Sequence, residues 1–177
     1  MSEPESLSVY LDTCIISGLA KEDLPKEEYR ALNSVLSLRK SGAIQLVTSF
    51  VVKAELEKIP EEFRIKHEVI YNLLSDVPVK RFRSITGLGP VGVPGFGFGR
   101  LNRDYLKLRQ LLRDAEDAKH VYQAIRNGIQ VFLTIDLRTI LRNRAVVEES
   151  FLIKLRSPSE FMREWGSKTH ISRADSG

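Results

Sequence analysis

Residues 114–136 read DAEDAKHVYQAIRNGIQVFLTID, and this stretch places a helical pattern, a stop signal and a strand in direct succession. Val121 and Ile125 mark the apolar side of a helix predicted over 114–127, and Gly128 is a typical C-terminal stop. The run VFLT at 131–134 predicts a buried strand, and Asp136 follows it. A helix followed by an apolar strand is typical of the β-α-β units that build parallel sheets.

The same alternation continues outward along the chain. Strands are predicted at 7–11, 44–48, 77–82, 131–134 and 151–155, and helices at 26–41, 50–59, 61–75, 101–113, 114–127, 137–143 and 158–165. This order predicts an α/β fold, a three-layer α/β/α sandwich with a central, mainly parallel sheet in which 7–11 is the central strand. Ligands of such folds bind at the carboxyl ends of the strands.

Composition and length predict one globular domain over 1–165 and a frayed polar tail over 166–177. The chain has 177 residues, of which 42% are hydrophobic and 28% charged, so disordered and collagen-like classes are excluded. Cys14 is the only cysteine, which excludes a disulfide scaffold and favours a reducing compartment. Since no 18-residue apolar run or signal peptide is found, we expect a cytoplasmic protein without a membrane partner.

Positive charge is concentrated over residues 80–113, which contain eight basic side chains and Asp104 as the single acid. Such a field favours a polyanion such as RNA, although a solvated helix face is the simpler alternative. This segment includes a glycine-rich loop, 84–100, whose G-x-G-x-x-G pattern is not followed by a helix and is therefore rejected as a dinucleotide site. We expect the loop to become ordered only when RNA binds, with phosphate contacts from Arg81, Arg83, Arg100 and Arg103.

Four acids occupy positions that a purely structural role explains incompletely. Asp12 and Asp136 follow apolar strands, although each is also placed to cap the next helix. Glu55 falls within the apolar stripe of its helix, where it needs either a cationic partner or an edge position that reaches water. Asp117 shares a helix face with Asp114, which is itself a candidate N-cap.

Convergence of these four carboxylates at one sheet edge would require a cation. Hard oxygen ligands select Mg²⁺ or Mn²⁺, and zinc is disfavoured because one cysteine and three scattered histidines form no spaced ligand set. His120 is either a residue of the site rim or, as the simpler reading has it, a surface histidine. Such a metal site indicates phosphate chemistry, in which the metal activates a water.

Other enzyme classes lack their required residues. A haloacid-dehalogenase-type phosphotransferase would need a second Asp two positions after Asp12, where Cys14 stands. A serine or cysteine hydrolase would need a nucleophile elbow, and no G-x-S-x-G is found.

The segments VYLDTCIISGL, TSFVVKAELEKI, DAKHVYQAIRNGIQVFLTID and LRSPSEFM resemble the successive motifs of PIN domains, the ribonuclease fold of VapC-type toxins. The resemblance covers about 7–165, with the glycine-rich loop as an insertion. It implies that Asp12, Glu55, Asp117 and Asp136 are the catalytic, metal-binding acids, supported by Thr13, Ser49 and Thr134. It leaves open whether Asp114 or Glu116 supplements or replaces Asp117.

The function implied by the resemblance is Mg²⁺- or Mn²⁺-dependent endoribonuclease activity that leaves a 5′-phosphate and a 3′-hydroxyl. The implied partners are RNA and, for a toxin, a cognate antitoxin protein, with homodimers common in the family. The alternative is a non-catalytic RNA-binding module of a larger RNA-processing assembly, which the basic segment alone would serve. Mg²⁺ or Mn²⁺ dependence distinguishes the two.

Overall fold

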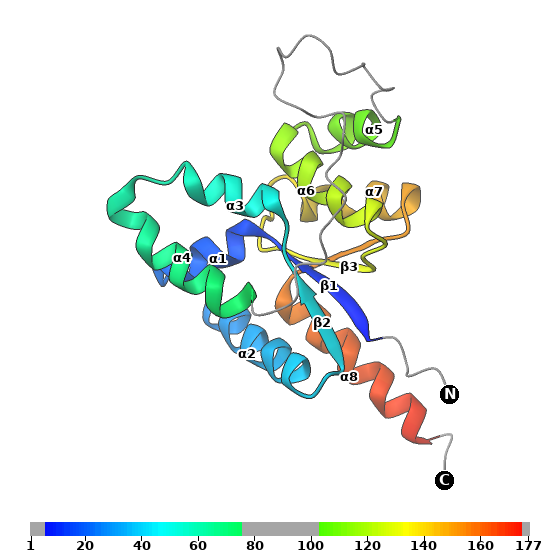
Figure 1. Ribbon diagram of the computed structural model, residues 1–177. Coiled ribbons are helices and arrows are strands. Elements are labelled where there is room, and N and C mark those ends of the chain that lie inside the picture. The colour runs from blue at the N-terminus through cyan, green and yellow to red at the C-terminus, as the bar shows by residue number, and fades with distance from the viewer. Residues whose placement is uncertain (1–5, 76–102, 175–177) are drawn as a thin grey trace.

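The computed structural model describes residues 6–75 and 103–174, and its four strands form one all-parallel sheet (Figure 1). The strands are β1 (Leu7–Leu11), β2 (Ile44–Val47), β3 (Val131–Leu133) and β4 (Lys154–Arg156), in the order β2-β1-β3-β4. Val9 of β1 lies opposite Leu46 of β2 and Val131 of β3. The predicted α/β sandwich is confirmed, with β1 in a central position.

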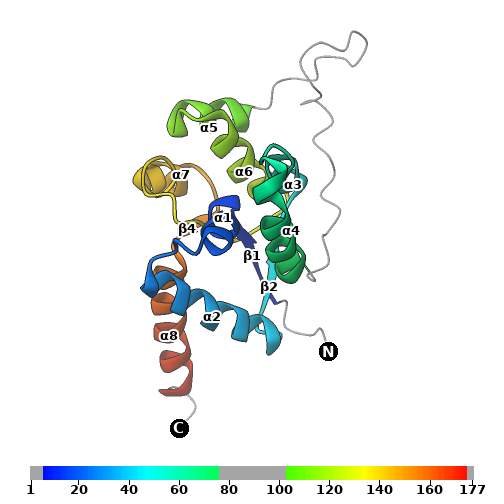
Figure 2. The same ribbon diagram turned by 90° about the vertical axis from the view of Figure 1, so that its left-hand side faces the viewer.

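Helices cover both faces of the sheet, as the view in Figure 2 shows. α2 and α8 pack against each other on one side, and α5, α6 and α7 lie on the other. α1 and α3 start directly after β1 and β2, respectively, and both pack against α4. The helices are α1 (Thr13–Lys21), α2 (Lys26–Lys40), α3 (Phe50–Glu57), α4 (Glu61–Ser75), α5 (Arg103–Leu112), α6 (Ala115–Arg126), α7 (Arg144–Ser150) and α8 (Pro158–Ala174).

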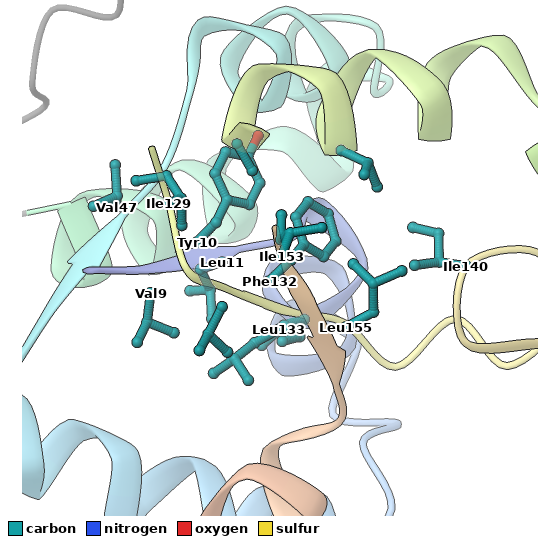
Figure 3. Close-up of a cluster of buried hydrophobic side chains, with 14 of the residues drawn as sticks. Val9, Tyr10, Leu11, Val47, Ile129, Phe132, Leu133, Ile140, Ile153 and Leu155 are labelled. Carbon is teal, nitrogen blue, oxygen red and sulfur yellow. The ribbon is translucent and has the colours of Figure 1, made fainter. Parts of the chain in front are cut away.

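The core lies between these layers because the strands alternate their side chains between the two faces of the sheet. Val9 and Leu133 point toward α2, whereas Tyr10 and Phe132 point toward α6 (Figure 3). All four are fully buried, and the rings of Tyr10 and Phe132 stack with centroids 4.8 Å apart. Two aromatic rings from the two central strands therefore support α6 from below.

The structure differs from the sequence prediction at α1, a helix that was not predicted, and in the C-terminal part. The predicted strand 151–155 is Lys154–Arg156, because Phe151 closes α7 with its N–H on the Val147 carbonyl. The predicted helix 137–143 is a turn followed by a 3-10 helix, Leu141–Asn143, and α7 was not predicted. α8 was predicted to end at Trp165 but continues to Ala174, since Gly166 keeps a helical backbone.

Two further predictions, the strand at 77–82 and the glycine-rich loop 84–100, lie outside the described residues. Within the described ranges, no helix is long and apolar enough to cross a membrane.

The outer edge of β4 is occupied by side chains. The backbone polar groups of Leu155 point away from β3: its N–H donates to Glu148 Oε1 (2.9 Å), and its carbonyl accepts from Arg156 Nη1 (2.7 Å). Arg156 in turn forms ion pairs with Glu148 and Glu164, both at 2.5 Å. The backbone groups of Leu155 are thus satisfied within the chain.

Candidate acidic site at the carboxyl ends of β1 and β3

Asp12 lies where β1 ends and α1 begins, and it is only 5% exposed. Its Oδ1 accepts the Thr13 backbone N–H (2.8 Å), and its Oδ2 accepts the Thr134 hydroxyl (2.7 Å) and the Cys14 thiol (2.9 Å). The Asp12 backbone N–H donates to the Leu133 carbonyl (3.1 Å), which joins the ends of β1 and β3. Asp12 therefore caps α1 and is also held in a defined orientation by β3.

Asp117 and Asp136 meet at one hydroxyl group. Oγ1 of Thr139 contacts Oδ2 of both carboxylates. Asp136 is oriented by its own turn, since its Oδ1 accepts the backbone N–H groups of Arg138 (2.7 Å) and Thr139 (3.1 Å). Its backbone N–H donates to Thr134 Oγ1 (3.0 Å), the group that also holds Asp12. Thr134 and Thr139 thus connect three of the four predicted acids.

A hydroxyl carries a single hydrogen and can donate it to only one of two carboxylates. The second carboxylate oxygen then faces the oxygen lone pairs of Thr139, which repel it unless a proton or a cation neutralises it. Burial raises the pKa of Asp117 to about 6, the charges of Asp114, Asp136 and Asp12 raise it as well, and the Thr139 hydroxyl acts in the opposite direction. Negative charge at this position is therefore unfavourable without a counterion.

Glu55 reaches the site from α3 and contacts a buried histidine. Oε2 of Glu55 lies 3.0 Å from Nε2 of His120; the two groups do not form a well-aligned hydrogen bond, and they form an ion pair when the imidazole is protonated. Burial opposes ionisation of Glu55, but His120, the Thr13 hydroxyl and Lys58 outweigh it and lower the pKa of the carboxyl. Burial likewise disfavours the imidazolium, but Glu55, Asp12 and Asp117 raise the pKa of His120.

The other ring nitrogen of His120 is held by the central strand. Nδ1 lies 2.8 Å from the hydroxyl of Tyr10, which lies 2.6 Å from the hydroxyl of Ser49. Ser49 also caps α3 by accepting the Val51 N–H (3.2 Å). His120 is 2% exposed, so the prediction of a surface histidine is wrong: β1, α3 and α6 enclose it.

Asp114 and Glu116 have local partners of their own. Asp114 caps α6, its Oδ1 accepting the N–H groups of Glu116 (2.8 Å) and Asp117 (3.0 Å). Glu116 pairs with Lys119 at 2.7 Å. The structure thus gives both acids a structural role and leaves Asp117 as the member of the run that meets Asp136. Thr13 Oγ1 is buried beside Glu55 and has no well-aligned hydrogen-bond partner in the described part of the chain.

The four acids offer the type of ligand atom that a hard cation prefers. Their spacing is less suitable. Asp12, Asp117, Asp136 and Glu55 offer oxygen atoms only, and burial together with the neighbouring carboxylates raises the pKa of Asp117. However, among residues 6–75 and 103–174 no three acidic, histidine or cysteine side chains are grouped closely enough to hold a metal ion. Asp117 and Asp136 are therefore the residues that would hold an ion first.

The predicted RNA-contacting arginines lie mostly beyond the described residues, since Arg81, Arg83 and Arg100 fall in 76–102. Arg103 begins α5 and is exposed. α5 packs against α6 and presents further exposed basic residues, namely Lys107 and Arg109, with Arg113 directly after it. Exposed cations therefore lie along α5 and directly after it, just before the first turn of α6, where Asp117 lies.

Thr139 and Tyr10 were missed as functional candidates, and His120 was considered only as a residue of the site rim or of the surface. Thr139 had a signal, because an Asp-x-x-Thr run lets the carboxylate accept the N–H three residues later. His120 also had one: Glu55 on an apolar stripe needed either a cationic partner or an edge position that reaches water. Tyr10 had none, since a tyrosine in an apolar strand is indistinguishable from any core aromatic.

No family model, curated protein or solved structure matches this chain.

Proposed function

We propose that this protein is a Mg²⁺- or Mn²⁺-dependent endoribonuclease of the PIN type that hydrolyses RNA phosphodiester bonds. The observation that carries the proposal is the contact of the Thr139 hydroxyl with both Asp117 and Asp136, beside a buried, oriented Asp12. Two carboxylates facing one hydroxyl repel each other unless a proton or a cation lies between them. A divalent cation would neutralise both, and carboxylate oxygens are the ligands that it prefers.

The hydroxyl groups of two threonines prepare this site. Thr134 orients Asp12 and accepts the backbone N–H of Asp136, so β1 and β3 present their acids together. Thr139 holds Asp117 against Asp136. When bound, Mg²⁺ or Mn²⁺ would lower the pKa of a water and neutralise the leaving oxyanion. The exposed cations Arg103, Lys107 and Arg109 favour a polyanionic substrate on the side where α6 begins.

The test is cleavage of a labelled RNA by the full chain with Mg²⁺, with Mn²⁺ and with EDTA. We expect cleavage that needs the divalent ion and leaves a 5′-phosphate. Asp12→Asn, Asp117→Asn and Asp136→Asn should abolish it, because each removes a charge and preserves the shape of the side chain. Glu57→Gln, on an exposed position of α3, is the matched control and should stay active. Cleavage that persists in EDTA, or full activity of Asp117→Asn in excess Mn²⁺, would contradict the proposal.

A second readout is binding of the ion itself. Mn²⁺ should raise the melting temperature of the wild type in a concentration-dependent manner, because a ligand that binds only the folded state stabilises it. Asp117→Asn should show a much smaller rise. Equal stabilisation of both proteins would place the ion elsewhere.

A non-catalytic RNA-binding module is the second candidate. It is favoured by the exposed cations of α5 together with the lack of a three-ligand cluster in the described ranges. It predicts RNA binding that is unchanged by EDTA, without cleavage under any condition.

A toxin role is a narrower form of the nuclease proposal. It predicts growth arrest on expression, relief by the product of a neighbouring small gene, and no arrest with Asp12→Asn. Homodimer formation, expected by the same analogy, is tested by light scattering.

A further inference from the structure

The side chain of His120 is fixed at both ring nitrogens. Nε2 lies 3.0 Å from Glu55 Oε2 and Nδ1 lies 2.8 Å from the Tyr10 hydroxyl. The His120 side chain is 3% exposed and that of Glu55 is 22% exposed. Only the carboxylate end of this chain of contacts therefore reaches solvent.

The hydrogen bonds from His120 through Tyr10 to Ser49 can form whether or not Nδ1 of the ring carries a hydrogen. If Nδ1 accepts, Tyr10 donates to it and Ser49 donates to Tyr10. If Nδ1 donates, Tyr10 accepts from it and donates to Ser49, whose oxygen also accepts the Val51 N–H. When Nδ1 accepts, Nε2 carries a hydrogen that faces Glu55. When Nδ1 donates, Nε2 carries that hydrogen as well if the ring is charged. Contact with the carboxylate is thus maintained without a change of geometry.

The support of this chain of contacts is rigid. Tyr10 lies in the central strand and is fully buried, and its ring stacks on Phe132 at an interplanar angle of 8°. Burial raises the pKa of Tyr10 well above its usual value, so the phenol remains a neutral donor and acceptor. Glu55, in contrast, has a flexible side chain and stands on an eight-residue helix. Without a partner its carboxylate would lose its orientation.

We propose that His120 is a positioning residue, which holds the Glu55 carboxylate toward the acidic site and is itself held by Tyr10 and Ser49. This inference rests on the proposed nuclease function, in which Glu55 is one of the acids. Thr13, the neighbour of Asp12, lies beside Glu55, so a change in the orientation of Glu55 acts directly on the site.

Two substitutions at position 120 separate the two contacts of the ring. Glutamine places an amide nitrogen near the position of Nε2 and keeps a donor toward Glu55, whereas asparagine keeps a polar group near Nδ1 only. We expect His120→Asn to lower kcat by roughly 10- to 100-fold with KM little changed, the range found when the partner of a ligand is removed. His120→Gln should restore most of kcat. Tyr10→Phe should lower kcat less than His120→Asn, because it removes the support and leaves the ring.

A double-mutant cycle with Glu55 distinguishes positioning from a general structural effect. In a Glu55→Gln background, His120→Asn should reduce the remaining activity by less than about twofold, because the group that it orients is already neutral. In a Glu57→Gln background it should have its full effect. Equal reductions in both backgrounds would overturn the proposal and assign His120 to the core alone.

A spectroscopic readout is independent of activity. The Nε2 proton of His120 should give a slowly exchanging imidazole resonance in the wild type that shifts in Glu55→Gln and not in Glu57→Gln. If the wild type cleaves RNA but His120→Asn retains its kcat, or the resonance is unaffected by Glu55→Gln, the positioning role is refuted. If the wild type cleaves no RNA while the resonance behaves as expected, the nuclease function fails and the Glu55–His120 contact stands. Should His120→Asn fail to fold, Tyr10→Phe takes its place in the same comparison, and His120→Gln remains the variant that keeps the donor toward Glu55.

Discussion

At the scale of single residues, Asp117 shows how burial and neighbouring charges together set the protonation of one carboxyl. Its pKa of about 6 lies above the ordinary 3.8, so the folded state binds this proton more tightly than the unfolded chain. The stability that this group contributes is therefore complete below pH 3.8 and is lost as the pH rises through about 6. Above that pH the ionised carboxylate is repelled by Asp114, Asp136 and Asp12.

Asp117→Asn should consequently stabilise the metal-free protein at about pH 7.5 and leave its stability unchanged at about pH 3.5. For a partly exposed carboxyl we expect the free energy of unfolding at about pH 7.5 to increase by about 1 kcal/mol after allowance for solvent screening. Urea unfolding of the wild type and the variant in EDTA, at the two pH values, measures this difference in stability. An equal effect at both values would mean that the charge of Asp117 is not the cause.

Thr139→Val should raise the pKa of Asp117 further, because it removes a hydroxyl that favours the ionised form. Thr139→Ser should restore the wild-type value. The carboxyl signals in a carbon-13 NMR titration measure both. A titration of Asp117 that is identical in the wild type and Thr139→Val would contradict the geometry at this hydroxyl.

The residue scale is also where prediction from sequence was weakest. Asp12 and Asp136 were identifiable because they follow apolar strands, and Glu55 because it interrupts an apolar stripe. Their partners Thr139, His120 and Tyr10 come from other elements or from turns. Only the packing of β1, α3 and α6 brings Tyr10, Glu55 and His120 together.

At the scale of elements, α6 was predicted nearly completely, because Asp114 and Gly128 mark its two ends and the intervening apolar residues follow a helical period. α7 was missed since its sequence, RAVVEES, is too short and too charged to show such a period. β4 was displaced because Phe151 and Ile153 are apolar but lie before the point where the ladder with β3 begins.

The capping role of Asp114 is testable at this scale. Asp114→Ala should destabilise the protein by about 1 kcal/mol, since two N–H groups of the first turn are deprived of their acceptor. Asp114→Asn should be close to the wild type in stability and in activity. Chemical denaturation measures the first and RNA cleavage the second. Loss of cleavage in Asp114→Asn at unchanged stability would instead make Asp114 part of the acidic site.

The basic face of α5 makes a separate prediction. Arg103→Ala combined with Arg109→Ala should weaken binding to every RNA sequence alike, and the salt dependence of binding should fall by about 0.7 for each phosphate of a single strand that the variant no longer neutralises. Arg30→Ala combined with Lys40→Ala, on exposed positions of α2, is the matched control. An unchanged salt dependence of the α5 variant would make this face a solvated surface.

At the scale of the whole molecule, the order of helices and strands was sufficient to predict the parallel sandwich. Parallel strands require long crossovers, and the chain supplies a helix after almost every apolar run. What the order could not show is how closely the acids approach one another, because that distance depends on the hydrogen bonds of Thr134 and Thr139.

The occupied edge of β4 has a consequence for self-association. A parallel sheet has two borders, and an uncovered border is a template on which another extended chain can be added. On the β4 border the donor and acceptor of Leu155 are already used by Glu148 and Arg156, so growth of the sheet from this side would first have to break those bonds. Arg156→Ala with Glu148→Ala should expose the template and give concentration-dependent aggregation with increased thioflavin fluorescence, whereas Glu149→Ala, on an exposed neighbouring position, should not. A double variant with the same oligomeric state as the wild type and no aggregation would mean that other parts of the chain protect this border.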